Sequence, residues 1–415
     1  MIRRLGLLVV IAAVFLFGTV APSAVAAAEG IEITRSLYSG LFPTTLSFNL
    51  SARSDAEIID ARLHYQVHRQ SFVEVENEAF VPITPAKEID ISYSLDLRRA
   101  GGLPPGTTVD YWWTLKDSAG SVTTSEISTL KFTDSRYQWQ TLQQGMVSLF
   151  WYTGSSTFAD ELMATAQGAL IKLEQDTGAS LTEPVEIYIY DSAQALQGSM
   201  VFPQEWTGGV AFTDFNTIAI GIEPSNINWG KRAIVHELTH LVTGQMTDNP
   251  YGGIPTWLNE GLSMYAEGPA DAIYLVFLNQ AIDQKSLISI NSLSSPFSAF
   301  ADISSLSYAE SRHIVSYLIE KYGQDKMLRL LDTFAGGATT DEALSAVYGF
   351  DMDGLNTEWQ AFIYDSAPTY VQSGVTWTPW LVILIVLVVG AAVVAAVWLF
   401  YPSAIAAAGA GRKND

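Results

Sequence analysis

Two histidines one helical turn apart are the clearest chemical signal in this chain of 415 residues. They are His236 and His240, with Glu237 directly after the first of them. Because four residues make about one helical turn, both imidazoles leave the same face of a helix predicted over about residues 228–244 and can share one metal ion. Glu237 is placed to reach a water on that ion. Two surface histidines with a salt-bridged glutamate would show the same short pattern, so this motif alone leaves both interpretations open.

A third ligand is expected from the next predicted helix, which starts with Pro255 at a first-turn position and closes at Gly268-Pro269. Glu260 stands twenty positions after His240 on this helix, enough for one loop and a return. Two imidazoles and one carboxylate leave a coordination position of zinc open for water, as in a catalytic site. The chain has no cysteine, so any metal must be held by His, Asp or Glu. We therefore predict one Zn²⁺ per chain.

The histidine motif, followed by the run Trp257-Leu258-Asn259-Glu260-Gly261, resembles the gluzincin metallopeptidases, which include thermolysin and the zinc aminopeptidases. The likeness to their peptidase-MA-like branch extends over about residues 138–364. It implies that His236, His240 and Glu260 are zinc ligands, that Glu237 is the general base, and that the substrate is a peptide or protein.

Two positions depart from this family. The exopeptidase motif of the aminopeptidases is missing, because residues 208–212 read Gly-Gly-Val-Ala-Phe. The acidic residue expected four positions after the ligand glutamate is also missing, because that position is Met264. Without the exopeptidase motif, the resemblance does not imply recognition of a terminal amine.

Two residues of a later helix are candidates for stabilising the oxyanion that develops during hydrolysis, which needs a donor besides the metal. They are Tyr308 and His313, on a helix predicted to end at Tyr322. The alternatives are a core position with a satisfied hydroxyl for Tyr308 and a solvent-facing position for His313. A strand at residues 208–212, or its hairpin partner at residues 217–222, could hold an extended substrate by main-chain pairing.

The elements that must position these residues fall into two predicted domains. Residues 31–134 alternate polar and apolar side chains between Gly- and Pro-rich turns, which predicts an all-β sandwich similar to immunoglobulin or fibronectin type III modules. His64 and His68 share one face of a strand there, and we interpret that face as solvated rather than metal-binding. Residues 135–366 mix helices and strands, including a helix at 158–176 that stops at Gly178, and are expected to form the zincin-type metallopeptidase domain.

The two ends of the chain read as targeting segments. Residues 1–28 have the basic, apolar and small-residue order of a signal peptide. After a linker at residues 367–377, an apolar run at residues 378–401 predicts a single transmembrane helix, and the basic residues of the tail at 402–415 place that tail in the cytoplasm. The expected localisation is a single-pass cell-membrane protein with an extracellular body.

The charge composition excludes one class of partner. Lys and Arg number 22 against 43 Asp and Glu, a net charge of −21, which excludes nucleic acid as a partner. We expect a membrane-anchored extracellular zinc peptidase. The alternative is a non-enzymatic surface binding protein that recognises its partner through the β-sandwich and keeps the second domain as a scaffold. The complete ligand set and base favour the peptidase.

Overall fold

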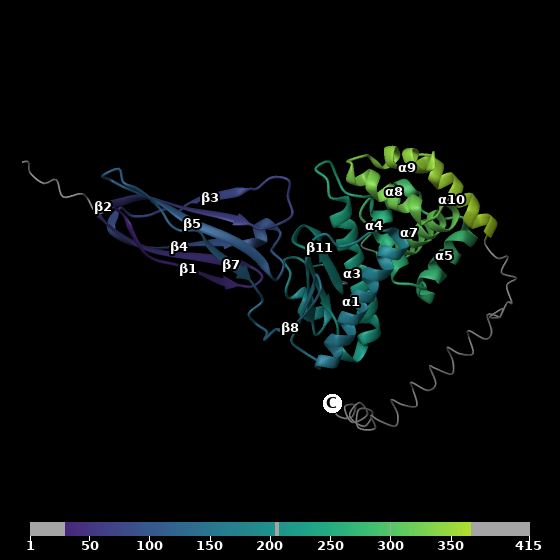
Figure 1. Ribbon diagram of the computed structural model, residues 1–415, viewed down its shortest axis with the longest axis horizontal. Helices are drawn as coiled ribbons and strands as arrows, with labels where there is room; N and C mark the ends of the chain where they lie inside the picture. Colours follow the sequence, from purple (N-terminus) through teal and green to yellow (C-terminus); the bar gives the residue numbers. More distant parts are fainter. Residues whose placement is uncertain (1–29, 204–206, 299, 367–415) are drawn as a thin grey trace, which may run out of the picture. The chain divides into compact units, whose positions relative to one another are not determined.

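The computed structural model describes residues 30–203, 207–298 and 300–366 (Figure 1). The described residues up to Trp359 belong to one compact unit, and residues 360–366 belong to a second. The first unit contains a β-rich region followed by an α/β part.

The β-rich region is built from strands whose inward side chains are apolar and whose outward side chains are polar. In β2, for example, Leu46, Phe48 and Leu50 are fully buried while the residues between them are half-buried. The elements are β1 (Glu32–Leu41), β2 (Thr45–Val67), β3 (Glu76–Phe80), β4 (Ala86–Asp96), the short 3₁₀ helix η1 (Leu97–Ala100), β5 (Thr107–Asp117), β6 (Val122–Thr124) and β7 (Ser128–Phe132).

These strands form one continuous seven-stranded sheet rather than the two separate sheets expected of a sandwich. The 23-residue strand β2 belongs to both halves: its first part pairs mainly with β1 and β4, and its second part pairs with β3 and β5. The halves face each other, because Phe48 in the first part packs on Tyr111 of β5 with ring centroids 4.9 Å apart. The sheet therefore folds over its own core along one shared strand.

His64 and His68 make separate contacts in this region. His64 is only 9% exposed, stacks on Trp112 with ring centroids 5.4 Å apart, and lies 2.8 Å from the Glu76 carboxylate. His68 pairs with Asp110 instead, at 2.8 Å. The prediction that both histidines sit on a solvated face is therefore wrong for His64, because the neighbouring strand β5 covers it with an indole.

The α/β part is centred on a five-stranded sheet in the order β11-β12-β10-β9-β8. Strands β9, β10 and β12 run parallel, and β8 and β11 pair antiparallel at the two edges. The strands are β8 (Gln140–Gln144), β9 (Val147–Trp151), β10 (Val185–Tyr190), β11 (Gly209–Phe212) and β12 (Thr217–Gly221), with the 3₁₀ turn η2 (Thr213–Phe215) joining β11 to β12.

Two long helices cover one face of this sheet. α1 (Ser156–Thr177) and α3 (Ile227–Thr247) share a buried apolar cluster with the strands (Figure 1). The prediction that the first helix stops at Gly178 is confirmed, since Gly178 is a left-handed cap at φ +73°. The predicted stop of the second at Gly244 is wrong, because that glycine packs against Thr213 and the helix continues to Thr247.

The remaining described elements are mostly helical. They are α2 (Ala193–Gln197), η3 (Pro224–Asn226), α4 (Thr256–Ala266), α5 (Ala272–Gln284), α6 (Ile290–Leu293), α7 (Ala301–Tyr322), α8 (Gln324–Ala335), α9 (Thr340–Tyr348) and α10 (Met352–Ser366). α4 approaches α7 closely at Gly261, where an added Cβ would lie 2.5 Å from the carbonyl oxygen of Ser311. Only glycine permits this distance, which brings the helix of Glu260 against the helix of Tyr308.

No helix in the described part of the chain is long and apolar enough to cross a membrane. Its longest helices, α1 and α7, carry charged side chains such as Glu161, Lys172 and Glu310 along their length. The predicted fold class and the predicted single-pass cell-membrane localisation, which both require a membrane-crossing helix, are corrected accordingly. What the structure describes is a β-rich region and an α/β part. The segments predicted as signal peptide, linker, transmembrane helix and cytoplasmic tail lie outside the described residues.

Candidate metal centre

The core side of α3 holds the two histidines in place. Ile234, Leu238 and Leu241 are fully buried in the cluster shared with the sheet, so the helix cannot rotate without losing that packing. His236 and His240 leave the helix one turn apart, toward α4, and their side chains are only 16% and 11% exposed. The structure thus brings both imidazoles into one partly buried pocket.

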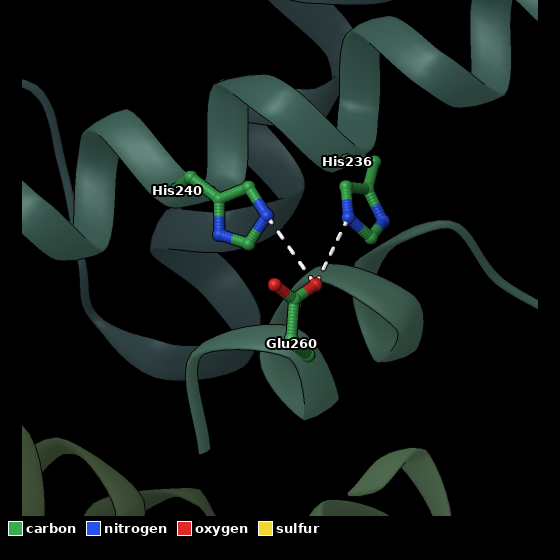
Figure 2. A group of neighbouring side chains, drawn as sticks. All are labelled: His236, His240 and Glu260. Atoms are coloured by element: carbon green, nitrogen blue, oxygen red, sulfur yellow. Dashed lines mark ion pairs between the residues drawn. The ribbon is translucent and has the colours of Figure 1, made fainter. Parts of the chain in front are cut away.

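Glu260 of α4 completes the cluster, as Figure 2 shows. Its Oε2 lies 3.3 Å from Nε2 of His236 and 3.5 Å from Nε2 of His240. Ligand atoms about 2.1 Å from a tetrahedral zinc ion lie roughly 3.4 Å from one another, so the two distances match two edges of such a site. Among the described residues this is the one group of three His, Cys, Asp or Glu side chains close enough to hold a metal ion.

The hydrogen bonding of Glu260 also fits a bound cation. Its Oε2 is buried and has no hydrogen-bond partner within the described ranges, although a buried carboxylate oxygen normally has one. The atom instead lies at ion-pair distance from both Nε2 atoms. The donor set is therefore suited to an ion bound between the three residues.

The other ring nitrogen of each histidine, Nδ1, lies within hydrogen-bond distance of a neighbouring side chain. Nδ1 of His236 lies 2.7 Å from the Glu267 carboxylate, which also accepts hydrogen bonds from Arg232. Nδ1 of His240 lies 3.0 Å from Oδ1 of Asn259 and 3.1 Å from Oγ of Ser263. An Nδ1–H that donates to these oxygens leaves a lone pair on Nε2, the form that binds a metal.

Glu267 and Asn259 are functional candidates that the sequence analysis missed. The family resemblance predicts an acidic residue four positions after Glu260, but that position is Met264, which is 3% exposed in the core. The carboxylate comes instead from Glu267, seven positions after Glu260. Seven residues are close to two helical turns, so helical periodicity could have found it on the same face.

The electrostatics favour a positive charge in the cluster. Burial by itself lowers the pKa of His236, but the carboxylates of Glu260 and Glu267 outweigh burial and raise this pKa to about 10. Burial disfavours the charged form of Glu260, yet His236 and His240 beside it lower its pKa. Carboxylates that hold a proton this firmly on an imidazole would also attract a metal cation.

Glu237 points toward the edge strand β11. A Cβ added to Gly209 of that strand would lie 2.6 Å from Oε1 of Glu237, so glycine leaves the space that the carboxylate occupies. Burial is the main cause of a raised pKa at Glu237, and His236 and His240 act in the opposite direction. The side chain therefore lies between the candidate metal ligands and the strand edge.

The two oxyanion candidates have different surroundings. The ring of Tyr308 lies 6.4 Å from the ring of His236. Burial, followed by the charges of Glu260 and Glu237, raises the pKa of Tyr308 so far that its hydroxyl stays protonated and can donate. His313 accepts a hydrogen bond from Nε1 of Trp359 at 3.0 Å, and burial lowers its pKa to about 4. The structure thus places Tyr308 beside the cluster and places His313 against Trp359, neither at the cluster nor facing solvent.

Residues 165–365 match the family described as the Peptidase MA superfamily. The matched stretch contains α3, α4 and α7 and supports a peptidase-like function for this part of the chain. No curated protein matches the chain.

Three solved structures illustrate the similarities that were found. Aminopeptidase A from Legionella pneumophila, in complex with aspartic acid, is 12% identical with a TM-score of 0.34, covering 80% of this chain and 50% of that one. Wild-type OgpA from Akkermansia muciniphila is 13% identical with a TM-score of 0.20, covering 27% of this chain and 31% of that one. The sporulation control protein Spo0M from Bacillus subtilis is 8% identical with a TM-score of 0.18, covering 34% of this chain and 55% of that one. The chain thus spans about a third to about half of these proteins.

Proposed function

We propose that this protein is a zinc-dependent peptidase that hydrolyses peptide bonds, with His236, His240 and Glu260 as the metal ligands. The observation that carries the proposal is the buried Oε2 of Glu260, which has no hydrogen-bond partner among the described residues. It lies 3.3 Å from Nε2 of His236 and 3.5 Å from Nε2 of His240. A zinc ion held there would supply a Lewis acid that polarises the scissile carbonyl and makes water a better nucleophile.

Glu237 is the general base in this proposal. It follows His236 directly, yet its side chain lies toward β11 rather than in the ligand cluster. From this position it takes a proton from the attacking water and then delivers that proton to the leaving amine.

β11 supplies the substrate-binding edge. It is the terminal strand of the five-stranded sheet, and Gly209 places its main chain against Glu237. The outer main-chain groups of β11 can pair with an extended peptide, which positions the scissile bond near Glu237 and the ligands. The protonated hydroxyl of Tyr308, whose ring lies 6.4 Å from the ring of His236, is the donor that we assign to the developing oxyanion.

The test is a peptide-library digestion by the full chain with and without a chelator. Glu237→Gln removes the base and no ligand, so the variant should keep its zinc and lose about 10²–10⁴-fold in activity. Tyr308→Phe should lose less, mainly in kcat. Glu126→Gln and Tyr38→Phe, which replace exposed side chains of the β-rich region, are the matched controls and should cleave normally.

Zinc-loaded wild type that cleaves no peptide in a chelator-sensitive way would contradict the proposal. In that case the non-enzymatic binding protein becomes the better interpretation. If wild-type protein purified from a zinc-containing preparation carries no zinc, the assignment of the three metal ligands is wrong.

A further inference from the structure

The segment at residues 68–75, which joins β2 to β3 in the β-rich region, reaches the α/β part next to the candidate site. The backbone N–H of Gln70 donates to the carbonyl oxygen of Asp214 at 2.6 Å. Asp214 lies in η2, the turn that follows β11 directly. The segment is thereby tied to the end of the proposed substrate-binding strand.

A cavity of about 670 Å³ connects this segment with the cluster of candidate metal ligands. His240 and Asn259 line it at the cluster, and residues 69–72 line it at the β-rich region. The loop between α3 and α4, at residues 248–254, forms a further wall. The cavity beside the candidate ligands is therefore bounded partly by the β-rich region.

The direction of β11 predicts which part of a substrate enters this cavity. Gly209 lies beside Glu237, and Thr213 lies beside Gly244, so β11 and η2 advance along α3 in the same sense as the helix. A peptide paired antiparallel to β11, the more stable arrangement, runs the opposite way. Its residues on the N-terminal side of the scissile bond then extend past Phe212 toward Thr213 and the cavity.

We infer that the enzyme is an endopeptidase in which residues 68–75 select the substrate on the N-terminal side of the scissile bond, an inference that rests on the proposed function. At about 3.3 Å per extended residue, the side chains roughly three to five positions before the scissile bond reach the segment. An aminopeptidase, which removes single N-terminal residues, would have no use for a cleft extended in this direction.

Aromatic side chains determine the preference. Phe72 is 58% exposed and Tyr251 is 82% exposed, and both line the cavity. The charged lining residues Arg69, Asp214 and Asp248 are of both signs and favour no single charge class. The chemical class that the cavity accepts is therefore a peptide with an apolar side chain at one of these positions, in contact with Phe72.

The experiment uses the full chain and two series of fluorogenic peptides with one fixed scissile bond. One series grows from one to six residues before that bond, with leucine at the added positions, and the other grows after it. The expected kcat/KM rises about tenfold as the first series reaches four or five residues, because one apolar side chain becomes buried. The second series should show no comparable rise.

Phe72→Ala should remove most of this rise while cleaving the shortest peptides at the wild-type rate. Phe80→Ala is the matched control, because Phe80 is 57% exposed in the same region and does not line the cavity. Phe72→Ser serves as a second variant if Phe72→Ala folds poorly, with zinc content as the folding check.

Three outcomes would overturn the inference while leaving the proposed function intact: release of single N-terminal residues as the main product, a kcat/KM independent of length before the bond, or identical behaviour of Phe72→Ala and Phe80→Ala. Absence of any cleavage that depends on Glu237 would overturn both together.

Discussion

Glu267 holds His236 on the side of the ring opposite the candidate ion. Its carboxylate lies 2.7 Å from Nδ1 and is itself held by Arg232, which also pairs with Asp271. The chain of contacts orients the imidazole and increases its basicity toward a metal.

Replacing Glu267 should therefore weaken zinc binding without removing a ligand. We expect Glu267→Ala to lower zinc affinity by about 10–100-fold, and Glu267→Gln, which keeps an acceptor oxygen, to lower it less. Competition with a colorimetric zinc chelator measures this, and the exposed Glu126→Gln provides the control. Unchanged affinity in Glu267→Ala would show that the contact does not orient the ligand.

Gly209 allows β11 to approach Glu237. Gly209→Ala places a methyl group 2.6 Å from Oε1 of Glu237, so the carboxylate or the strand must move. A displacement of this size should lower kcat by on the order of 10²-fold while zinc content stays at the wild-type level. Gly168→Ala is the matched control, because nothing lies within 4 Å of its added Cβ and it does not line the substrate cavity. Steady-state kinetics of the two variants check the prediction, and equal kcat values would contradict it.

At the scale of elements, the site depends on how α4 fits against its neighbours. Gly261 lets α4 lie against Ser311 of α7, and Glu310 on the same turn of α7 is fully buried. Both oxygens of Glu310 lie 3.1 Å from the backbone N of Ile288, so this carboxyl fastens the chain after α5 to α7.

Glu310 should make stability depend on pH. Burial raises its pKa from 4.5 to about 8, and the Ile288 N–H opposes only part of this change. Between these values the folded chain holds a proton that the unfolded chain has lost, so this group's contribution to the free energy of unfolding falls as pH rises from about 4.5 to about 8. In Glu310→Gln, the change in the free energy of unfolding over this pH range should be smaller by on the order of a few kcal/mol.

Urea denaturation at pH 5 and pH 8 measures this difference. Glu320→Gln, an exposed glutamate of the same helix, should keep the wild-type dependence. If the wild type and Glu310→Gln lose stability in parallel between the two pH values, the assigned ionisation is incorrect.

At the scale of the whole molecule, the proposed ion joins helices that are distant in sequence. α3 and α4 carry the ligands, and α7 packs on α4, so an ion that binds only the folded chain stabilises the folded chain. Free zinc at about 100 times its Kd contributes about 2.7 kcal/mol.

Removing the metal should thus lower the thermal midpoint by several degrees, as a chelator titration in a scanning fluorescence measurement would show. His240→Ala, which lacks one ligand, should start at the lower midpoint and respond little to the chelator. An equal response in both proteins would place the chelator-sensitive ion elsewhere.

The local spacing of residues was enough to predict several structural features of this protein from its sequence. The four-residue spacing puts His236 and His240 on one helix face whatever surrounds it, and alternation predicts strands such as β2 because side chains in a strand alternate sides. The stop at Gly178 follows from its backbone freedom. Each of these features depends on residues near one another in the chain.

Tertiary structure decided the features that depend on distant residues. Only the packing of α4 on α3 brings Glu260 to both Nε2 atoms and Glu267 behind His236, and only the fold places His313 against Trp359. The sharing of β2 between two halves of one sheet and the approach of residues 69–72 to His240 have the same origin. These contacts join segments separated by 20 to over 150 positions, and their free energy depends on the three-dimensional fit of whole elements, which no local pattern of residues records.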